Sequence, residues 1–330
     1  MSARPLTNAR VLLNACMTKS NPAPIFAAAV LLLSCWSSLL LAQAPSPPLE
    51  LLVLGSGGPG AAGRAASSCL VFVDGVARIL VDAGPGSFVR LGESKASLAN
   101  TDLVLLTHLH IDHVGELPGL FKARAVSASG PVVFSVWGPG GSPGQGQDAY
   151  FPSTRKFMQL VFGRKGAFAY LSDFAAPVSI HAHDIAAGAT DAVPVQIFKE
   201  GDLLIRAVAG HHGDAPAMIY RIDHGGKSVT FSGDIDAGGL PALRGIAKDT
   251  NLLVFNSVVL DPPGSPAILY TLHTPPLAIG ELAKAVGVRE LLLSHLSPGV
   301  DENRDAVLKS IRRNYQGPVT FAGDGLRTRP

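Results

Sequence analysis

Residues 101–115 read TDLVLLTHLHIDHVG, and this stretch decides the fold. Its first part, 101–106, is a nearly continuous apolar run, which is typical of a strand buried on both faces. Directly after that run come His108, His110, Asp112 and His113. Imidazole and carboxylate donors packed this closely suit zinc, and they are enough to serve two metal ions a few Å apart. The stretch therefore predicts most of a dinuclear zinc site at the end of a buried strand.

The same pattern recurs along the chain: an apolar strand ends in a loop that carries His or Asp. We expect further strands at 49–54, 132–137, 203–208, 217–222, 228–231, 252–254 and 290–293. His211 and His212 follow one of them, Asp234 follows another, and His295 follows the last. Ligands gathered at one edge of a sheet are the expected geometry of an active site. Helices are predicted at 87–99, 117–126 and 276–286.

Residues 55–60, GSGGPG, match the G-x-G-x-x-G pattern of dinucleotide-binding folds, and the acidic residue Asp74 lies downstream. Dinucleotide binding needs a long crossover helix directly after the glycines. Instead, 69–73 and 76–82 are typical of two strands joined by a tight Asp74-Gly75 turn. We therefore interpret the glycines as a turn and not as a cofactor site.

The first 48 residues have the layout of a secretory leader. Basic residues precede the apolar stretch 25–42, which ends in Ala42-Gln43-Ala44 before the Pro-rich residues 45–48. Translation starts at Met1 or Met17, and cleavage is expected after Ala44. One alternative is an uncleaved membrane anchor facing outward, because about 18 apolar residues are near the minimum for spanning. A lipoprotein modified at Cys35 is the other.

Composition favours one large domain after this leader. The 330 residues are 47% hydrophobic and carry a net charge of only +2, with the basic residues scattered. Strong nucleic-acid affinity is therefore not predicted by charge. After the leader only Cys69 remains, so no intramolecular disulfide is expected there. We predict an exported protein, periplasmic or extracellular, with a leader and linker at 1–48 and a hydrolase domain at 49–330.

The sequence resembles the metallo-β-lactamase-fold hydrolases, and within them the ribonuclease Z-like branch, over roughly residues 49–326. The motif H-x-H-x-D-H is present at 108–113, and His212-Gly213 lies before the strand that contains Tyr-Arg-Ile at 220–222. Asp234 in Ser-Gly-Asp and His295 in Leu-Ser-His-Leu-Ser-Pro match the branch as well, and so does His273-Thr274. The resemblance implies an α/β (α+β) fold, a four-layer αββα sandwich of two mixed sheets flanked by helices.

The resemblance also implies two Zn²⁺ per chain. One zinc would be held by His108, His110, His212 and Asp234, and the other by Asp112, His113, Asp234 and His295. His211 competes with His212, and the His-Gly order favours His212. In diiron oxidoreductases of this fold a glutamate usually replaces the second histidine, so His110 favours hydrolysis.

Three further side chains receive roles. Asp112 is expected to orient a metal-bridging hydroxide, and His273 to protonate the leaving oxygen. Asp82 is expected to hydrogen-bond a ligand imidazole and fix its tautomer, with a simple turn cap as the alternative. Three other histidines have no motif around them and are interpreted as ordinary loop residues: His181, His183 and His224.

Two departures from the branch bear on the substrate. An export leader does not suit precursor transfer RNA, and between His113 and His212 the sequence shows no Gly/Pro-rich hairpin with a basic tip. Four basic residues, at 155–156 and 164–165, either bind phosphate or sulfate or form a solvated helix face.

The sequence thus leaves three hypotheses. The first is an exported zinc phosphodiesterase or related anionic-ester hydrolase that acts on a small or medium anionic ester. The second is a ribonuclease Z-type endonuclease that processes transfer-RNA 3′ ends, and the third is a non-catalytic metal-binding scaffold protein. Nucleic acid is a possible but not favoured partner, membrane contact is expected only through an uncleaved leader, and a homodimer is left open.

Overall fold

We describe the chain from a computed structural model that covers residues 46–60, 62–144, 150–186 and 193–330. The prediction of a leader at 1–48 lies outside the described residues, apart from 46–48. Within the covered ranges, no helix is both long enough and apolar enough to cross a membrane.

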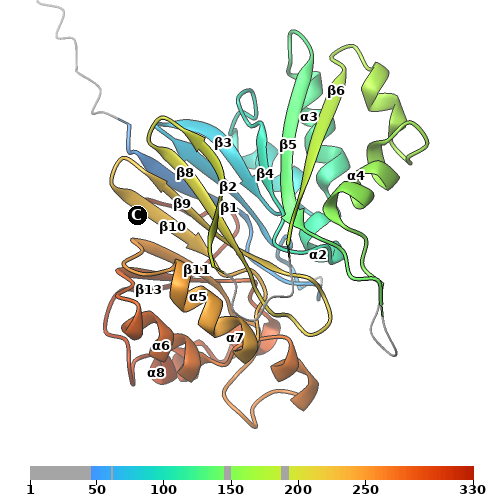
Figure 1. The fold of residues 1–330 in the computed structure, drawn as a ribbon. Coiled ribbons are helices and arrows are strands. Elements are labelled where there is room, and N and C mark those ends of the chain that lie inside the picture. Colours follow the sequence, from blue (N-terminus) through green and yellow to red (C-terminus); the bar gives the residue numbers. More distant parts are fainter. Residues whose placement is uncertain (1–45, 61, 145–149, 187–192) are drawn as a thin grey trace, which may run out of the picture. The chain divides into compact units, whose positions relative to one another are not determined.

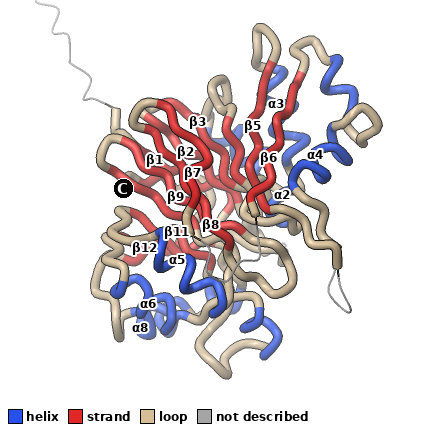
Figure 2. Tube along the Cα trace, in the orientation of Figure 1, coloured by secondary structure: helices blue, strands red, loops and turns tan. Residues whose placement is uncertain are grey.

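Two mixed sheets form the centre of the fold (Figure 1, Figure 2). The first has the spatial order β14 (Arg327–Thr328), β1 (Leu49–Gly55), β2 (Ser68–Val73), β3 (Val76–Val81), β4 (Leu103–Leu105), β5 (Val132–Pro139), β6 (Val178–Ile185). The second has the order β13 (Val319–Phe321), β12 (Glu290–Ser294), β11 (Leu252–Asn256), β10 (Lys227–Phe231), β9 (Met218–His224), β8 (Leu203–Ala209), β7 (Val195–Glu200). In both sheets an antiparallel half continues into a parallel half.

Helices cover the outer face of each sheet. Those on the first sheet are α1 (Ser87–Ser94), α2 (Ile111–Val114), α3 (Leu117–Val126) and α4 (Thr154–Phe162), with the 3-10 turn η1 (Ala169–Asp173). Those on the second sheet are α5 (Leu240–Ile246), α6 (Pro276–Ala285), α7 (Pro298–Glu302) and α8 (Arg304–Ile311). Two further 3-10 turns are η2 (Ala237–Gly239) and η3 (Ala267–Thr271). The prediction of a four-layer αββα sandwich is confirmed.

Alternation along the central strands explains their continuous apolar sequence. In β1, Leu51 and Val53 pack between the two sheets, whereas Leu52 and Leu54 pack under the helices of the first sheet. In β4, Leu105 faces the core between the two sheets, and Val104, the residue before it, faces the helices. Because successive side chains point to opposite faces, a strand buried on both faces must be apolar at nearly every position.

The segment after the glycines forms a hairpin, as predicted. Strands β2 and β3 are antiparallel, and both turn residues, Asp74 and Gly75, have positive φ of 51° and 81°. Strand β2 also pairs antiparallel with β1. A dinucleotide-binding unit requires parallel strands there, so this arrangement contradicts that interpretation of 55–60.

One predicted helix is shorter than expected. The sequence predicts a helix over 87–99, but α1 ends at Ser94. Lys95 adopts the left-handed conformation with φ 56°, and its N–H donates to the carbonyl of Gly92. This closes the last turn and directs the chain into the loop before β4.

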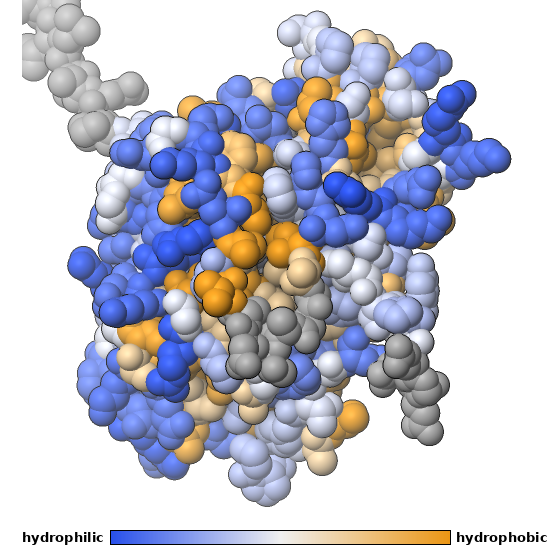
Figure 3. Space-filling view, in the orientation of Figure 1, coloured by the Kyte–Doolittle hydropathy of each residue, from blue (hydrophilic) through white to orange (hydrophobic). Residues whose placement is uncertain are grey.

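Strand β7 leaves apolar side chains at the surface of the second sheet's edge. On the face in Figure 3, apolar side chains gather near the middle, over β7 and β8, and hydrophilic ones surround them. Val195 is 49% exposed there. Edge strands with this exposure are candidates for contact with other molecules.

Helix α3 is attached to β5 by an aromatic stack. Phe121 lies 1% exposed in α3, and its ring centroid is 4.0 Å from that of Phe134. We expect Phe121→Ala to lower the free energy of unfolding by about 3–5 kcal/mol, because it removes buried area and leaves a cavity. Phe88→Ala is the control, since Phe88 is 45% exposed, and should cost less than about 1 kcal/mol. Guanidinium unfolding measures both, and equal losses would contradict this packing.

Candidate active site

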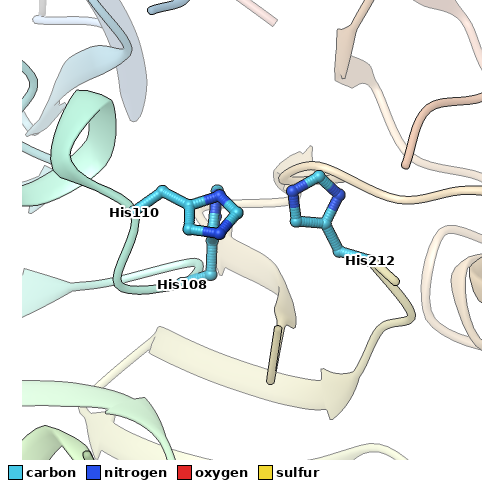
Figure 4. A group of neighbouring side chains, drawn as sticks. All are labelled: His108, His110 and His212. Atoms are coloured by element: carbon cyan, nitrogen blue, oxygen red, sulfur yellow. The ribbon is translucent and has the colours of Figure 1, made fainter. Parts of the chain in front are cut away.

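The polar residues that follow the strands meet at one edge of the two sheets. His108, His110 and the short helix α2 follow β4, and His212 follows β8. Asp234 follows β10, and His295 follows β12. In Figure 4 the rings of His108, His110 and His212 turn toward one another. Ligand atoms of these three lie within 4.8 Å of one another, and so do those of Asp112, His113 and His295.

These histidines and aspartates form a cluster, and the carboxylate of Asp234 lies at its centre. Its Oδ2 lies 3.4 Å from a nitrogen of His295 and 3.6 Å from one of His113. Three more imidazole nitrogens lie within 4.0 Å of the same oxygen, those of His108, His212 and His273. Both predicted ligand sets therefore converge on the one carboxylate that is expected to belong to both.

Two of the imidazoles have their tautomer fixed by a second contact. Nδ1 of His113 lies 2.8 Å from Oδ2 of Asp82, and Nδ1 of His212 lies 2.7 Å from the carbonyl oxygen of Leu272. Because each Nδ1 donates to an oxygen, each ring turns its Nε2 toward Asp234. Nε2 of His113 is buried and has no hydrogen-bond partner.

These contacts test whether the residues fit a metal. Imidazole nitrogens crowd around one carboxylate oxygen, and Nε2 of His113 and Nδ1 of His273 are buried there without a hydrogen-bond partner. A cation would satisfy them all, and the nitrogen and oxygen donors suit zinc. The donor set therefore fits the implied metal.

The charges in the cluster differ between its members. Burial alone would lower the pKa of His113, but the carboxylates of Asp82 and Asp234 raise it well above its ordinary value. Burial would raise the pKa of Asp234, but the imidazoles of His295 and His113 lower it well below its ordinary value. Burial and the neighbouring imidazole of His113 lower the pKa of His108 well below its ordinary value. Asp234 is thus anionic and His108 neutral near pH 7, the protonation states that metal ligands require.

Asp82 is anchored on three sides. Its Oδ1 accepts from the backbone N–H of Thr107, its Oδ2 accepts from the Thr107 hydroxyl, and Oδ2 also contacts His113. Asp82 itself has a φ of 58°, a conformation that few side chains other than Asn and Asp tolerate. These contacts place Asp82 where it orients an imidazole.

Two adjacent histidines have opposite environments. His212 is buried in the cluster, whereas the side chain of His211 is 52% exposed and pairs with Asp236 through Nδ1 at 2.8 Å. The geometry therefore brings His212, not His211, to Asp234.

The three histidines interpreted as ordinary lie outside the cluster. His183 stacks on Trp137 at 4.0 Å between centroids, and His224 pairs with Asp74. His181 is exposed on β6.

His273 lies beside the cluster in a state that differs from the expectation. Its Nδ1 is 4.0 Å from Oδ2 of Asp234 and is buried without a hydrogen-bond partner. Burial lowers the pKa of His273 to about 4, although Asp234 opposes the shift. This pKa lies below the value of about 6.5 from which the role of proton donor was predicted. Near pH 7 His273 is a neutral imidazole.

The sequence missed two residues that shape the cluster. Asn256 ends β11, and its Nδ2 donates to Oδ1 of Asp234 at 2.6 Å. Gly58 lies against His295, and a Cβ there would sit 2.5 Å from Cε1 of that ring. The pattern of a polar residue after an apolar strand marks Asn256, but no pattern in the sequence links Gly58 to His295.

Comparison with known proteins identifies the family. Residues 62–263 match the model of the metallo-beta-lactamase superfamily. The chain belongs to this superfamily.

Relatives and solved structures agree with that assignment. The chain is 28% identical to ribonuclease Z of Mycobacterium sp. (strain KMS) over 271 residues, which covers 78% of this chain and 87% of the relative. The fold matches human tRNase Z, short form, with a TM-score of 0.64, 19% identity and coverage of 84% of this chain and 98% of that chain. It also matches the metallo-beta-lactamase fold protein YhfI from Bacillus subtilis, with a TM-score of 0.61, 21% identity and coverage of 85% and 99%. The prediction of a metal-dependent hydrolase that acts on ester bonds is confirmed.

Asn256 gives a test of how the cluster is oriented. Asn256→Ala removes the hydrogen bond to Asp234, so we expect metal affinity to fall about 10–100-fold. Competition with a chromogenic chelator measures the affinity. The matched control is Asn251→Ala, directly before the same strand, where the side chain accepts hydrogen bonds from Ser228 and does not reach the cluster. Asn251→Ala should lower stability but not metal affinity, and an equal loss in both variants would contradict the role of Asn256.

Proposed function

We propose that this protein is an exported dinuclear zinc hydrolase that cleaves phosphodiesters or related anionic esters. The observation that carries the proposal is the convergence of imidazole nitrogens on the single carboxylate oxygen of Asp234. One zinc would be held by His108, His110, His212 and Asp234, and the other by Asp112, His113, Asp234 and His295. Export rests on the sequence of residues 1–48, and the number and identity of the metal ions rest on this donor set.

When bound, two zinc ions would lower the pKa of a water molecule toward 7 and provide positive charge for the attacked ester. The protein's own side chains orient the attacking oxygen and the metal ligands. Oδ2 of Asp112 lies 3.1 Å from Nε2 of His295 at the rim of the cluster, and Asp112 accepts the proton of the attacking oxygen and aims it. Asp82, Asn256 and the carbonyl of Leu272 hold their partners in place, so the site needs little rearrangement during reaction.

His273 acts on the leaving oxygen as a neutral hydrogen-bond donor. Its ring lies beside His212 and His295, at centroid distances of 5.3 Å and 6.0 Å. It therefore borders one residue from each of the two predicted ligand sets. A donor aimed at the oxygen that gains negative charge stabilises the transition state without being an imidazolium.

A ribonuclease Z-type endonuclease is the second candidate. The match to a mycobacterial ribonuclease Z over most of both chains favours it. Against it, the described residues 150–177 form α4 and η1, which pack on the first sheet and do not extend as a basic hairpin. Arg155 donates through Nε to the carbonyl of Ala182, so part of the basic cluster at 155–165 packs against β6. A small or medium anionic ester therefore fits better than transfer RNA.

One set of assays separates the two candidates. The chain from Pro45 onward should contain about two zinc ions and hydrolyse an aryl phosphodiester faster than an aryl sulfate, a β-lactam or precursor transfer RNA. Asp112→Ala should lower diesterase activity about 100-fold or more. Zinc below one ion per chain, or full activity in Asp112→Ala, would contradict the proposed mechanism. Faster cleavage of precursor transfer RNA would favour the second candidate.

His273 gives a separate test. His273→Ala should lower kcat about 100-fold, because a donor to the leaving oxygen is lost, while zinc content stays unchanged. Elemental analysis and steady-state kinetics measure the two quantities. His181→Ala is the matched control, since His181 is an exposed histidine on β6, and it should leave both unchanged. Loss of zinc in His273→Ala would reassign His273 as a ligand.

A further inference from the structure

A small cavity lies directly beside the metal cluster. Its volume is about 220 Å³, and it borders the ring of His295. Most of the other residues that line it are apolar or glycine and come from three loops, among them Gly57, Gly58, Val258, Leu269, Leu296 and Pro298. Apolar pockets with few polar groups next to a reactive centre are the usual binding sites for small ligands.

The cavity lies close to the predicted metal ligand His295 and to the turn before His273. His295 is the residue whose Nε2 faces Asp112 and Asp234. Leu269 belongs to η3, and its carbonyl accepts the backbone N–H of His273 at 2.9 Å. The cavity therefore lies between η3, which ends two residues before His273, and the loop that carries His295. A leaving oxygen held by His273 would have its substituent close to this cavity.

The cavity offers no free charge. Arg64 also borders it, but its guanidinium forms a bidentate pair with Asp301 at 2.7 and 2.8 Å. The remaining NH1 donates to the hydroxyl of Ser56 and to the carbonyl of Ala322. Arg64 therefore contributes its aliphatic stem to the wall while its charge is used elsewhere. The cavity therefore provides no charged group that would bind a phosphate or sulfate.

The size of the cavity limits its occupant. An apolar cavity of about 150 Å³ in another protein holds benzene. A cavity of about 220 Å³ thus has room for one aromatic ring with a small substituent, or for a short branched alkyl group. It is too small for a long acyl chain.

We propose that this cavity binds the apolar group of the ester, so that the substrates are small anionic esters with an aryl leaving group. The inference rests on the proposed function, because that function places an anionic ester at the cluster. It adds that the anionic part of the substrate binds at the cluster and the aryl part binds in the cavity. Leu269 is then a residue that determines specificity.

Binding measurements with two kinds of probe test the proposal. On the zinc-loaded chain, phenylphosphonate should bind about tenfold tighter than methylphosphonate in calorimetry, because the phenyl ring is buried. Neutral 4-fluorophenol, followed by fluorine NMR, reports on the cavity even if the cluster does not hydrolyse phosphodiesters. It should bind the wild-type chain.

Two variants and a matched control define the site. Leu269→Trp fills the cavity, so it should abolish the preference for phenyl and the binding of 4-fluorophenol while methylphosphonate still binds. Leu269→Ala enlarges it and should shift the preference about tenfold from phenylphosphonate toward 1-naphthylphosphonate. A gain of preference of this kind cannot come from misfolding. Ile268→Trp is the control, because Ile268 is the neighbouring residue and is 66% exposed, and it should change nothing.

The outcomes separate this proposal from the proposed function. Equal affinity for the two phosphonates, or absence of 4-fluorophenol binding in the wild type, would overturn the proposal for the cavity alone. No phosphonate binding and no diester hydrolysis, with 4-fluorophenol still bound and displaced by Leu269→Trp, would overturn the proposed function but leave an aryl site. If Leu269→Trp slows precursor transfer-RNA cleavage and no phenyl preference exists, the cavity holds a nucleotide base and the proposal is wrong.

Discussion

The buried carboxylate of Asp234 is the interaction on which the rest of the structure depends. Burying an anion is costly unless positive charge and donors surround it. Asn256 supplies a donor to one oxygen, and ring nitrogens of five histidines lie within 4.0 Å of the other. Cations bound between these nitrogens and the carboxylate would balance its charge. Strands from both sheets end at this edge and hold these side chains in place.

Much of the fold and of the cluster could be predicted from local sequence. Continuous apolar runs predict strands buried on both faces, because alternate residues pack in different layers. The motif at 108–113 carries its own spacing, and Asp234 and His295 each follow a strand closely. The choice between His211 and His212 also follows from local order, and the structure agrees with it by burying His212.

What the sequence could not predict depends on contacts between distant segments. The hydrogen bond from His212 to the carbonyl of Leu272 joins residues 60 positions apart, and a backbone acceptor leaves no trace in residue type. Gly58 is required because His295 packs against it, not because of its own turn. The pKa of His273 shifts because the folded chain buries it. The end of α1 at Ser94 depends on the backbone conformation of Lys95, which its residue type does not favour.

Strands from the two ends of the described chain pair with each other near the same cluster. Strand β14 pairs with β1, Asp324 accepts from Ser56, and the N–H of Leu296 donates to the carbonyl of Ser56. The loop that presents His295 is therefore secured by the first strand, which is completed by the last few residues. An unfinished chain offers the histidines of 108–113 without the partners that distinguish one metal from another. If the chain is exported unfolded, as proposed, it would bind metal only where it folds, so the metal supply of that compartment would decide which ions it carries.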